Sequence, residues 1–435
     1  MFTRQPLFES GRNHQGFDAC RALLLLGAVA GVIDCGGAPS EPAPPEQPGP
    51  SVEAPPTVPP QPTTEATPST TTPPSEAPPD GKQVFRYDTF GDEQFWTDVA
   101  RMHEVIQKSV SPKTALSVGL KVDAEAIPPD VAQAIKDGKV DLGSPATTVT
   151  LLKLNAVVGL KGTVKTEGGK DTLASVGITC ALCHSTVDDS FSKGIGKRLD
   201  GWPNRDLNVG AIIALSPAIP PAEKTIYKGW GPGKYDPRMN LDKKNTPLVI
   251  PPAYGLANVK NETYTAEGPI SYWNAYVAVT QMHGRGKFSD PRLSIDVKGE
   301  PDLVTPKLDA LKSYQHALPT PQPPAGSFDQ AAAGRGKAIF DKSCAGCHVG
   351  GSGTDNNDGK LHAASETKMN GAYAARTATK MYRTTPLRGL WQHPPYFHDG
   401  SAKTLADVVR HYSGALTLKL SDPQKRDLIE YLKTL

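Results

Sequence analysis

The sequence predicts a mainly α-helical fold in which two tandem domains follow a disordered, Pro-rich segment. Three observations lead to this prediction: a Cys-x-x-Cys-His motif occurs twice, apolar residues recur at helical spacing, and Pro is concentrated near the N-terminus. With 435 residues, the chain is long enough for more than one domain. Its 47 basic and 45 acidic residues form no long run of one charge, so we expect no nucleic-acid partner.

Residues 1–35 are typical of an export signal. Arg21 precedes twelve apolar or small residues, which are too few to cross a bilayer as a stable helix. Two processing sites stay open: cleavage after Ala30, or lipid attachment at Cys35, where Asp34 is an unusual preceding residue. Both place the chain outside the cytoplasm, either in the periplasm or as a lipoprotein held at the outer membrane through Cys35.

Residues 36–82 are expected to form a disordered linker. Sixteen of the residues from Gly36 to Asp80 are Pro, and the stretch contains no aromatic residue, Ile, Leu, Lys or Arg. Such a composition cannot bury a core and favours extended polyproline conformations. A long tether directly after a lipid site would hold a folded part away from a membrane, which favours the lipoprotein hypothesis.

The repeated motif predicts two c-type haems. Two thiols separated by two residues can add to the vinyl groups of one haem, and the imidazole that follows can bind its iron. Zinc ribbons usually separate their cysteine pairs by about 15–20 residues, whereas 160 residues separate these two pairs. The predicted attachment and iron-binding residues are Cys180, Cys183, His184, Cys344, Cys347 and His348.

The second haem motif has flanks typical of a cytochrome c-like domain, which we place at 327–435. A helix leads into the motif, with Ser327 and Gln330 as its predicted capping box, and another closes the chain, with Ser421 and Gln424 in the same roles. The Pro-rich stretch 317–326 separates this domain from the first.

The first haem domain is expected to span 83–316 and to contain long loops. A helix is predicted over 92–110, because apolar residues recur there at helical spacing. Its predicted core face consists of Phe95, Trp96, Val99, Met102 and Ile106. A weak internal repeat, 245–284 against 384–414, indicates that the two haem domains are related.

The stretch TPLRGLWQHPPYFHDGSAKTLADVVRHY, 385–412, resembles the bacterial di-haem cytochrome c peroxidase family, which includes the enzyme that matures methylamine dehydrogenase. The resemblance covers about 170–435 and is more specific at the second haem. One departure is Gly389, which follows Arg388 where the family usually has Asn. In this family the sixth ligand of the second iron comes from the helix after PYFHDGS. The resemblance therefore implies Tyr412, with His411 and Met381 as rivals.

The first iron departs from the family pattern. The peroxidases carry a distal His soon after the first motif, and Lys197 stands near that place here. Gln281 stands where the family's acid–base Glu is expected, and an amide cannot exchange a proton usefully near neutral pH. Met282 or His283 could bind the first iron instead. The resemblance also implies an aromatic bridge between the haems, for which Trp202 and Trp273 are the candidates, and it leaves a calcium ion between the domains open.

Two functions fit these residues. The first is electron transfer through two haems to redox partner proteins. The alternative is a peroxidase-like oxidoreductase that reduces hydrogen peroxide or oxidises an organic substrate, which requires an iron with a reachable distal side and an acid–base group. Whether the chain is an enzyme is therefore open at this point, and an oxygenase that uses haem as its cofactor and a non-redox tethered binding module are lesser alternatives.

Overall fold

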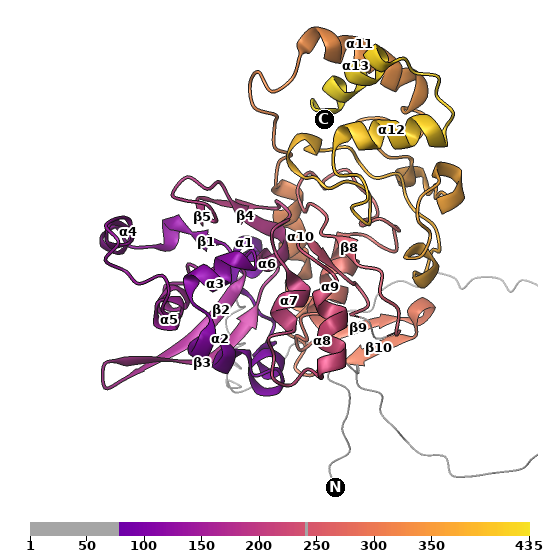
Figure 1. Cartoon of the computed structure of the whole chain (residues 1–435). Coiled ribbons are helices and arrows are strands. Elements are labelled where there is room, and N and C mark those ends of the chain that lie inside the picture. The colour runs from indigo at the N-terminus through magenta and orange to yellow at the C-terminus, as the bar shows by residue number, and fades with distance from the viewer. Residues whose placement is uncertain (1–77, 240–241) are drawn as a thin grey trace, which may run out of the picture. The chain divides into compact units, whose positions relative to one another are not determined.

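The computed structural model describes residues 78–239 and 242–435 (Figure 1). The predicted signal, Cys35 and nearly all of the predicted linker lie outside these residues. Helix α1 begins at Gly81 and ends at Tyr87, with the Asp80 carboxylate accepting hydrogen bonds from the first backbone amides. In the described part of the chain, no helix is long and apolar enough to cross a membrane.

The helix predicted over 92–110 is broken into two pieces. A π-helical turn, η1 (Gln94–Val99), is followed by α2 (Met102–Ser109), and Arg101 between them has a φ of 55°. Four members of the predicted core face are buried, but Val99 is 44% exposed. The break at Arg101 rotates α2 relative to η1, so one helical period cannot describe both pieces.

The structure also contains β-strands, which the prediction of a mainly α-helical fold missed. The longest pair is the antiparallel hairpin of β2 (Leu160–Glu167) and β3 (Lys170–Ile178), joined by Gly168 and Gly169, both at positive φ. All sheets in the described residues have two strands. The other pairs are β1 (Val122–Asp123) with β5 (Ile195–Gly196), β4 (Ser185–Val187) with β6 (Arg198–Asp200), β7 (Lys234–Tyr235) with β8 (Leu248–Val249), and β9 (Lys287–Asp290) with β10 (Ile295–Lys298).

The remaining elements before the second motif are short helices linked by loops. They are α3 (Pro112–Ser117), α4 (Pro129–Lys136), α5 (Pro145–Lys153), α6 (Ala181–His184), α7 (Val209–Ile213), α8 (Pro221–Lys228), α9 (Ile270–Thr280) and α10 (Leu308–Ala317). Helices account for 40% of the residues and strands for 13%. The fold is therefore mixed helix and strand rather than mainly α.

The C-terminal part is helical, as predicted. Helices α11 (Gln330–Ser343) and α13 (Asp422–Leu432) pack against each other beside α12 (Leu405–Ala415) (Figure 1). Gly336 permits this contact, because a Cβ there would lie 2.0 Å from the backbone oxygen of Asp427. The Ser421–Gln424 capping box is confirmed. The Ser327–Gln330 box is wrong: Asp329 caps α11 instead, one residue before its start.

Short 3-10 turns occupy several loops. They lie at Ala124–Ala126, Pro291–Leu293, Thr305–Lys307, Asp355–Asp358, Ala364–Thr367, Ala374–Arg376 and Leu390–Gln392. Arg376, at the end of one of them, reaches back to a loop that precedes α9 in the sequence. Its guanidinium donates two hydrogen bonds to Asp236, at 2.8 and 3.0 Å, and also pairs with Asp242 at 2.7 Å. Arg376 and Asp236 have side chains only 1% and 0% exposed, so this pair ties the two halves together in a buried setting.

Replacing Arg376 with Met should destabilise the protein strongly. The change leaves Asp236 buried without its bidentate partner, and breaking a buried pair in this way costs about 3–5 kcal/mol. Denaturant unfolding measures the loss. Arg335→Met is the matched control, because Arg335 makes a comparable pair with Asp427 but is 62% exposed; it should change stability little. Equal effects of the two substitutions would contradict the role assigned to Arg376.

Candidate functional site

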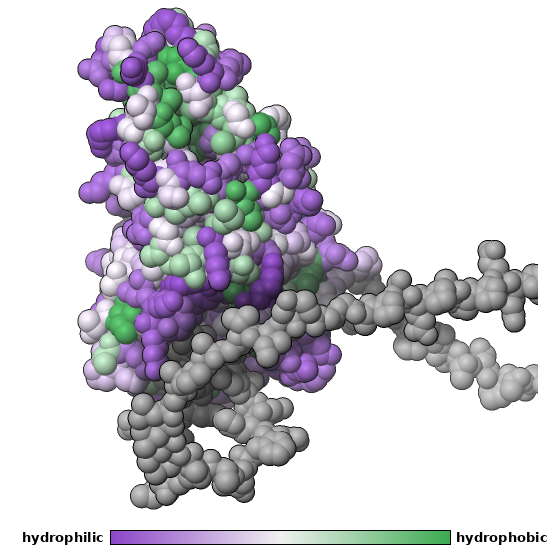
Figure 2. All heavy atoms as spheres, turned by 90° about the vertical axis from the view of Figure 1, so that its right-hand side faces the viewer, coloured by the Kyte–Doolittle hydropathy of each residue, from purple (hydrophilic) through white to green (hydrophobic). Residues whose placement is uncertain are grey.

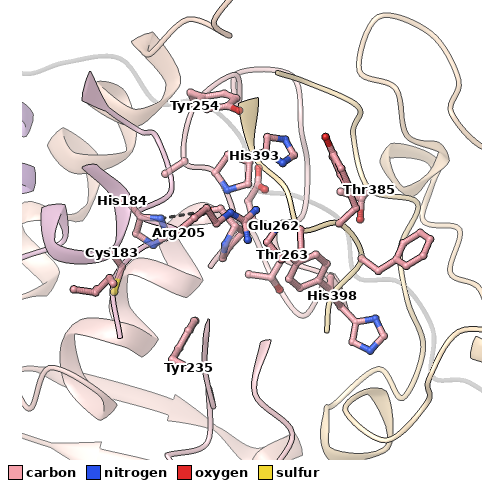
Figure 3. Close-up of a pocket in the computed structure, with 18 of the residues that line it drawn as sticks. Cys183, His184, Arg205, Tyr235, Tyr254, Glu262, Thr263, Thr385, His393 and His398 are labelled. Atoms are coloured by element: carbon pink, nitrogen blue, oxygen red, sulfur yellow. Dashed lines mark hydrogen bonds between the residues drawn. The ribbon is translucent and has the colours of Figure 1, made fainter. Parts of the chain in front are cut away.

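A single cavity of about 490 Å³ is lined by both Cys-x-x-Cys-His motifs. Its volume is in the range of ordinary cofactor and ligand sites. Residues from both halves of the chain form its wall, which is mostly apolar, and Figure 3 shows the polar side chains gathered in one region of it. The two motifs, 160 residues apart in the sequence, therefore open onto one space.

The first motif lies on α6, directly after β3. Gly159 allows the motif to pack closely, because a Cβ there would lie 2.1 Å from the Cα of Leu182. The Nδ1 atom of His184 lies 3.1 Å from the carbonyl oxygen of Pro251, and we assign the Nδ1 proton to this bond. Burial lowers the pKa of His184 to about 4. The imidazole is then neutral at pH 7 and its Nε2 is available to a metal, as expected of an iron ligand.

The second motif follows the end of α11. The Nδ1 atom of His348 lies 3.2 Å from the carbonyl oxygen of Gly353, which repeats the arrangement of the first motif. Burial lowers the pKa of His348, so this imidazole is also neutral at pH 7. Cys344 is partly buried, whereas Cys347 is exposed. The second site is thus nearer the surface than the first.

The four motif cysteines carry free thiols. Burial raises the pKa of Cys180 and of Cys183 to about 12, and that of Cys344 to about 11. With no group bound to them, these thiols are therefore protonated at pH 7. Protonated thiols facing an apolar cavity agree with their addition to haem vinyl groups.

Among the candidates for the sixth ligand of the second iron, Tyr412 lines the cavity and the other two do not. Tyr412 belongs to α12, and burial raises the pKa of its hydroxyl to about 12. His411 points elsewhere, because its Nε2 hydrogen-bonds the carbonyl oxygen of Thr367 at 2.8 Å. Met381 contributes nothing to the cavity wall.

At the first iron, Met282 lines the cavity and is 3% exposed. Its backbone oxygen accepts a hydrogen bond from the Trp96 indole at 3.0 Å, which fixes the chain at the end of α9. His283 lies outside the cavity wall and stacks on Phe95, with 3.8 Å between the ring centroids. Gln281 lines the cavity and donates to the carbonyl oxygen of Pro237 at 2.8 Å. Lys197 is exposed and lies away from the cavity.

The two candidate bridging tryptophans differ in position. Trp273 lines the cavity, whereas Trp202 does not. Trp202 instead packs edge-to-face against Trp391, with ring centroids 5.9 Å apart, and against Tyr254 at 6.4 Å. Trp391 follows the second motif, so this contact joins parts of the chain before and after that motif, as does the contact between Tyr264 and His398, whose ring centroids are 6.3 Å apart.

Sequence reasoning missed a charged part of the cavity wall. Arg205, Glu262, Arg383 and Arg388 all line the cavity, and we call these four residues the charged wall. Figure 3 shows Arg205 close to Glu262 and Thr263. Arg388 lies in the recognised C-terminal stretch and could have been found from it. Arg205 and Glu262 stand in loops without a motif, and no sequence signal marked them.

Several buried polar atoms at the cavity have no partner within the described residues. They are Nε and Nη1 of Arg205, Oε1 of Glu262, Oγ1 of Thr263, Nε1 of Trp273, Nε of Arg383, Nδ1 of His393 and Oγ of Ser413. Buried polar groups are normally hydrogen-bonded. A haem meets this need, since its propionate carboxylates accept from guanidinium groups while its ring fills apolar space. The residues present therefore fit haem.

Gly389 accounts for a departure from the familiar pattern. Its φ is 63°, a left-handed conformation that Gly adopts freely and Asn more readily than most residues. A Cβ at this position would lie 2.4 Å from the hydroxyl oxygen of Tyr254. Gly therefore adopts this turn without strain and leaves room for Tyr254 in the cavity wall.

One group of metal-binding side chains is found in the described residues outside the proximal histidines. Its members are Cys347, Asp355 and His362, whose ligand atoms lie within 4.8 Å of one another. Calcium prefers a set of oxygen ligands, which this group does not offer. The calcium ion of the resemblance stays a prediction.

Comparison with known proteins decides the family. The profile of the Cytochrome c family matches residues 333–435. The methylamine utilization protein MauG of Methylophilus methylotrophus is 30% identical over 294 residues, which cover 60% of this chain and 77% of that protein. The chain belongs to the MauG family. This family is di-haem cytochrome c peroxidase-like, so the chain is a haem-based redox protein with c-type haem.

A second MauG protein and two solved structures are also similar to this MauG-family chain. MauG of Methylorubrum extorquens is 31% identical over 151 residues, 29% of this chain and 42% of that protein. Hydrazine synthase of Kuenenia stuttgartiensis has 19% identity and a TM-score of 0.30, covering 44% of this chain and 73% of that one. A MauG-like protein associated with microbial copper homeostasis has 18% identity and a TM-score of 0.32, covering 44% and 74%.

Proposed function

We propose that this protein is an exported di-haem c-type cytochrome that transfers electrons through two covalently attached haems. The single observation that carries the proposal is the shared cavity, because both attachment motifs line it. Haems held in one cavity are close enough in space to exchange electrons. The two motifs would then belong to two haem domains in tandem, at 83–316 and 327–435.

The chain's residues have distinct parts in this proposal. Haem supplies one-electron redox chemistry when it is attached. Cys180 and Cys183 hold the first haem and Cys344 and Cys347 the second, through thioether bonds. His184 and His348 would bind the irons through Nε2, since each donates its Nδ1 proton to a backbone carbonyl.

The sixth ligands follow from which candidates line the cavity. We propose Tyr412 for the second iron, because His411 and Met381 lie outside the cavity wall. For the first iron we propose Met282, which is buried and lines the cavity, in preference to His283. Two six-coordinate irons favour electron transfer over peroxide chemistry, because neither then offers a free position.

A specific observation favours the peroxidase-like alternative. Tyr412 is the eighth residue after Thr404, the N-cap of α12, and the eighth residue after Pro269, the N-cap of α9, is Val277. Val277 lines the cavity and has no atom that can bind iron. If α9 covers the first haem as α12 covers the second, the first iron is open to a small molecule such as hydrogen peroxide.

The proposal also includes a redox partner protein and a location at the surface of a membrane. The exposed Cys347 places one edge of the second haem near the surface, where a redox partner protein can approach. Figure 2 shows apolar side chains at the top of the molecule, over the C-terminal helices. Leu416, directly after the end of α12, is 40% exposed. An exported protein with a lipid on Cys35 would work at the surface of a membrane.

Changing Cys35 to Ala should release the protein from membranes. The lipid would be lost together with the thiol that carries it, while the folded part is unaffected. Cell fractionation followed by haem staining measures the distribution. Cys20→Ala is the control and should leave the protein membrane-bound. A protein that is not membrane-bound even with Cys35 intact would instead support cleavage after Ala30.

Haem content per chain tests the proposed function. Denatured protein should retain two haems, because thioether bonds survive unfolding. Replacing Cys180 and Cys183 together by Ala should leave one, and replacing Cys344 and Cys347 together should leave the other. Haem absorbance per chain on denaturing gels provides the count. A denatured protein without haem would refute the proposal.

The spin state of each iron tests the sixth ligands. The oxidised protein should be mainly low-spin at both irons. Met282→Ala should convert the first haem to high spin, and Tyr412→Phe should change the spectrum of the second. Electron paramagnetic resonance distinguishes the two states, with Met381→Ala as the control that leaves both unchanged. A first haem that is already high-spin in the unmutated protein, with rapid peroxide turnover, would favour the peroxidase-like alternative.

A further inference from the structure

Glu262 is a buried acid in the cavity wall. It lies in the loop before α9, its backbone bridges to Gly268, and it is 6% exposed. Its Oε2 accepts a hydrogen bond from Arg383 at 3.3 Å. Its Oε1 has no partner within the described residues. Only one of the two carboxylate oxygens therefore has a hydrogen-bond partner. Burying such a carboxylate in its charged form costs free energy.

Two neighbouring residues, Arg383 and Arg205, link Glu262 to the two predicted haem sites. Toward the second, Arg383 precedes Thr384 and Thr385, which line the cavity together with His348. Toward the first, Arg205 lines the same cavity and its charge acts on His184. Figure 3 shows Glu262 and Arg205 beside each other, between His184 and Thr385. Glu262 thus stands in the wall of the cavity that both motif histidines line.

Three guanidinium groups share the cavity wall with Glu262, those of Arg205, Arg383 and Arg388. Burial raises the pKa of Glu262, and Arg383 and Arg388 lower it, which leaves it at about 7. The Tyr264 hydroxyl, two residues along the chain, is neutral at pH 7, because burial raises its pKa. A haem propionate drawn to Arg383 would add negative charge near Glu262. This added charge would raise the pKa of Glu262 further.

We propose that Glu262 takes up a proton when a haem in this cavity is reduced, and so couples electron transfer to proton transfer. An external one-electron donor, such as a redox partner protein, supplies the electron, and solvent supplies the proton. Ferric haem becomes ferrous, and the Glu262 carboxylate becomes a carboxylic acid by forming an O–H bond. No other bond forms or breaks. This proposal rests on the haem electron transfer proposed above.

The physical cause is electrostatic. Reduction makes the haem one unit more negative, and at low dielectric this change is felt strongly by a carboxylate in the same wall. The pKa of Glu262 therefore rises on reduction. Below its pKa in the oxidised protein, Glu262 is protonated in both states and the midpoint potential does not depend on pH. Between the two pKa values the potential falls as the pH rises, by up to about 59 mV for each tenfold drop in proton concentration.

Redox titration of the intact haem-loaded protein at a series of pH values tests this proposal. The unmutated protein should show a flat potential at acid pH and a fall that begins near or above pH 7. Glu262→Gln should abolish the fall and hold the potential near its acid value, because the amide stays neutral and still accepts from Arg383. Glu267→Gln is the matched control: Glu267 is a buried acid paired with Arg238 at 3.0 Å, outside the cavity wall. It should leave the fall unchanged.

A second measurement does not depend on a variant. Infrared difference spectra of the unmutated protein, reduced minus oxidised and recorded at a pH where the potential falls, should show a new carbonyl stretch of a protonated carboxyl group. A pH-dependent fall that persists in Glu262→Gln, or the absence of this band, would overturn the proposal. Haem content distinguishes this failure from that of the proposed function: a protein that binds haem but shows neither effect refutes only the role of Glu262.

Discussion

The interior of this protein is organised around an apolar space that its own side chains do not fill. Protein cores are normally close-packed. A cavity of about 490 Å³ lined by both motifs is of the size that cofactors fill. A bound haem would complete this core, and thioether bonds at the motif cysteines would keep the haem in place.

The charged wall imposes a second condition on the occupant. Three guanidinium groups and one carboxyl group line the cavity, so positive charge is in excess there. Buried charges without partners are strongly destabilising. An occupant with carboxylates at its edge satisfies Arg205 and Arg383 and leaves the ring among apolar side chains. The same excess of positive charge holds the pKa of Glu262 near 7 rather than higher, which makes this acid sensitive to the charge of a neighbouring iron.

The local signals predicted part of the structure well. The closing helix with its Ser421–Gln424 box and the helix before the second motif were readable, because capping and periodicity act over a few residues. The split between η1 and α2 was not, since a left-handed Arg101 leaves no trace in an apolar pattern. The β2–β3 hairpin was missed because β2 buries none of its residues and β3 buries only three of nine, so neither strand shows a regular apolar alternation.

The residues of the candidate site could be predicted where they lie close together in the sequence. In each motif, the two cysteines and the histidine lie within five consecutive residues. Tyr412 lies in the stretch 385–412, which resembles the family. The charged wall was not predictable, because loops distant in the sequence bring Arg205, Glu262 and Arg383 together only after folding. Burial, which gives Glu262 its altered pKa, is likewise a property of the folded chain.

Iron positions in a crystal of the haem-loaded protein test the central claim most directly. An anomalous difference map at the iron absorption edge should contain two strong peaks per chain, one beside Nε2 of His184 and one beside Nε2 of His348, both at the shared cavity. A single peak, or two peaks in separate pockets away from these imidazoles, would contradict the account.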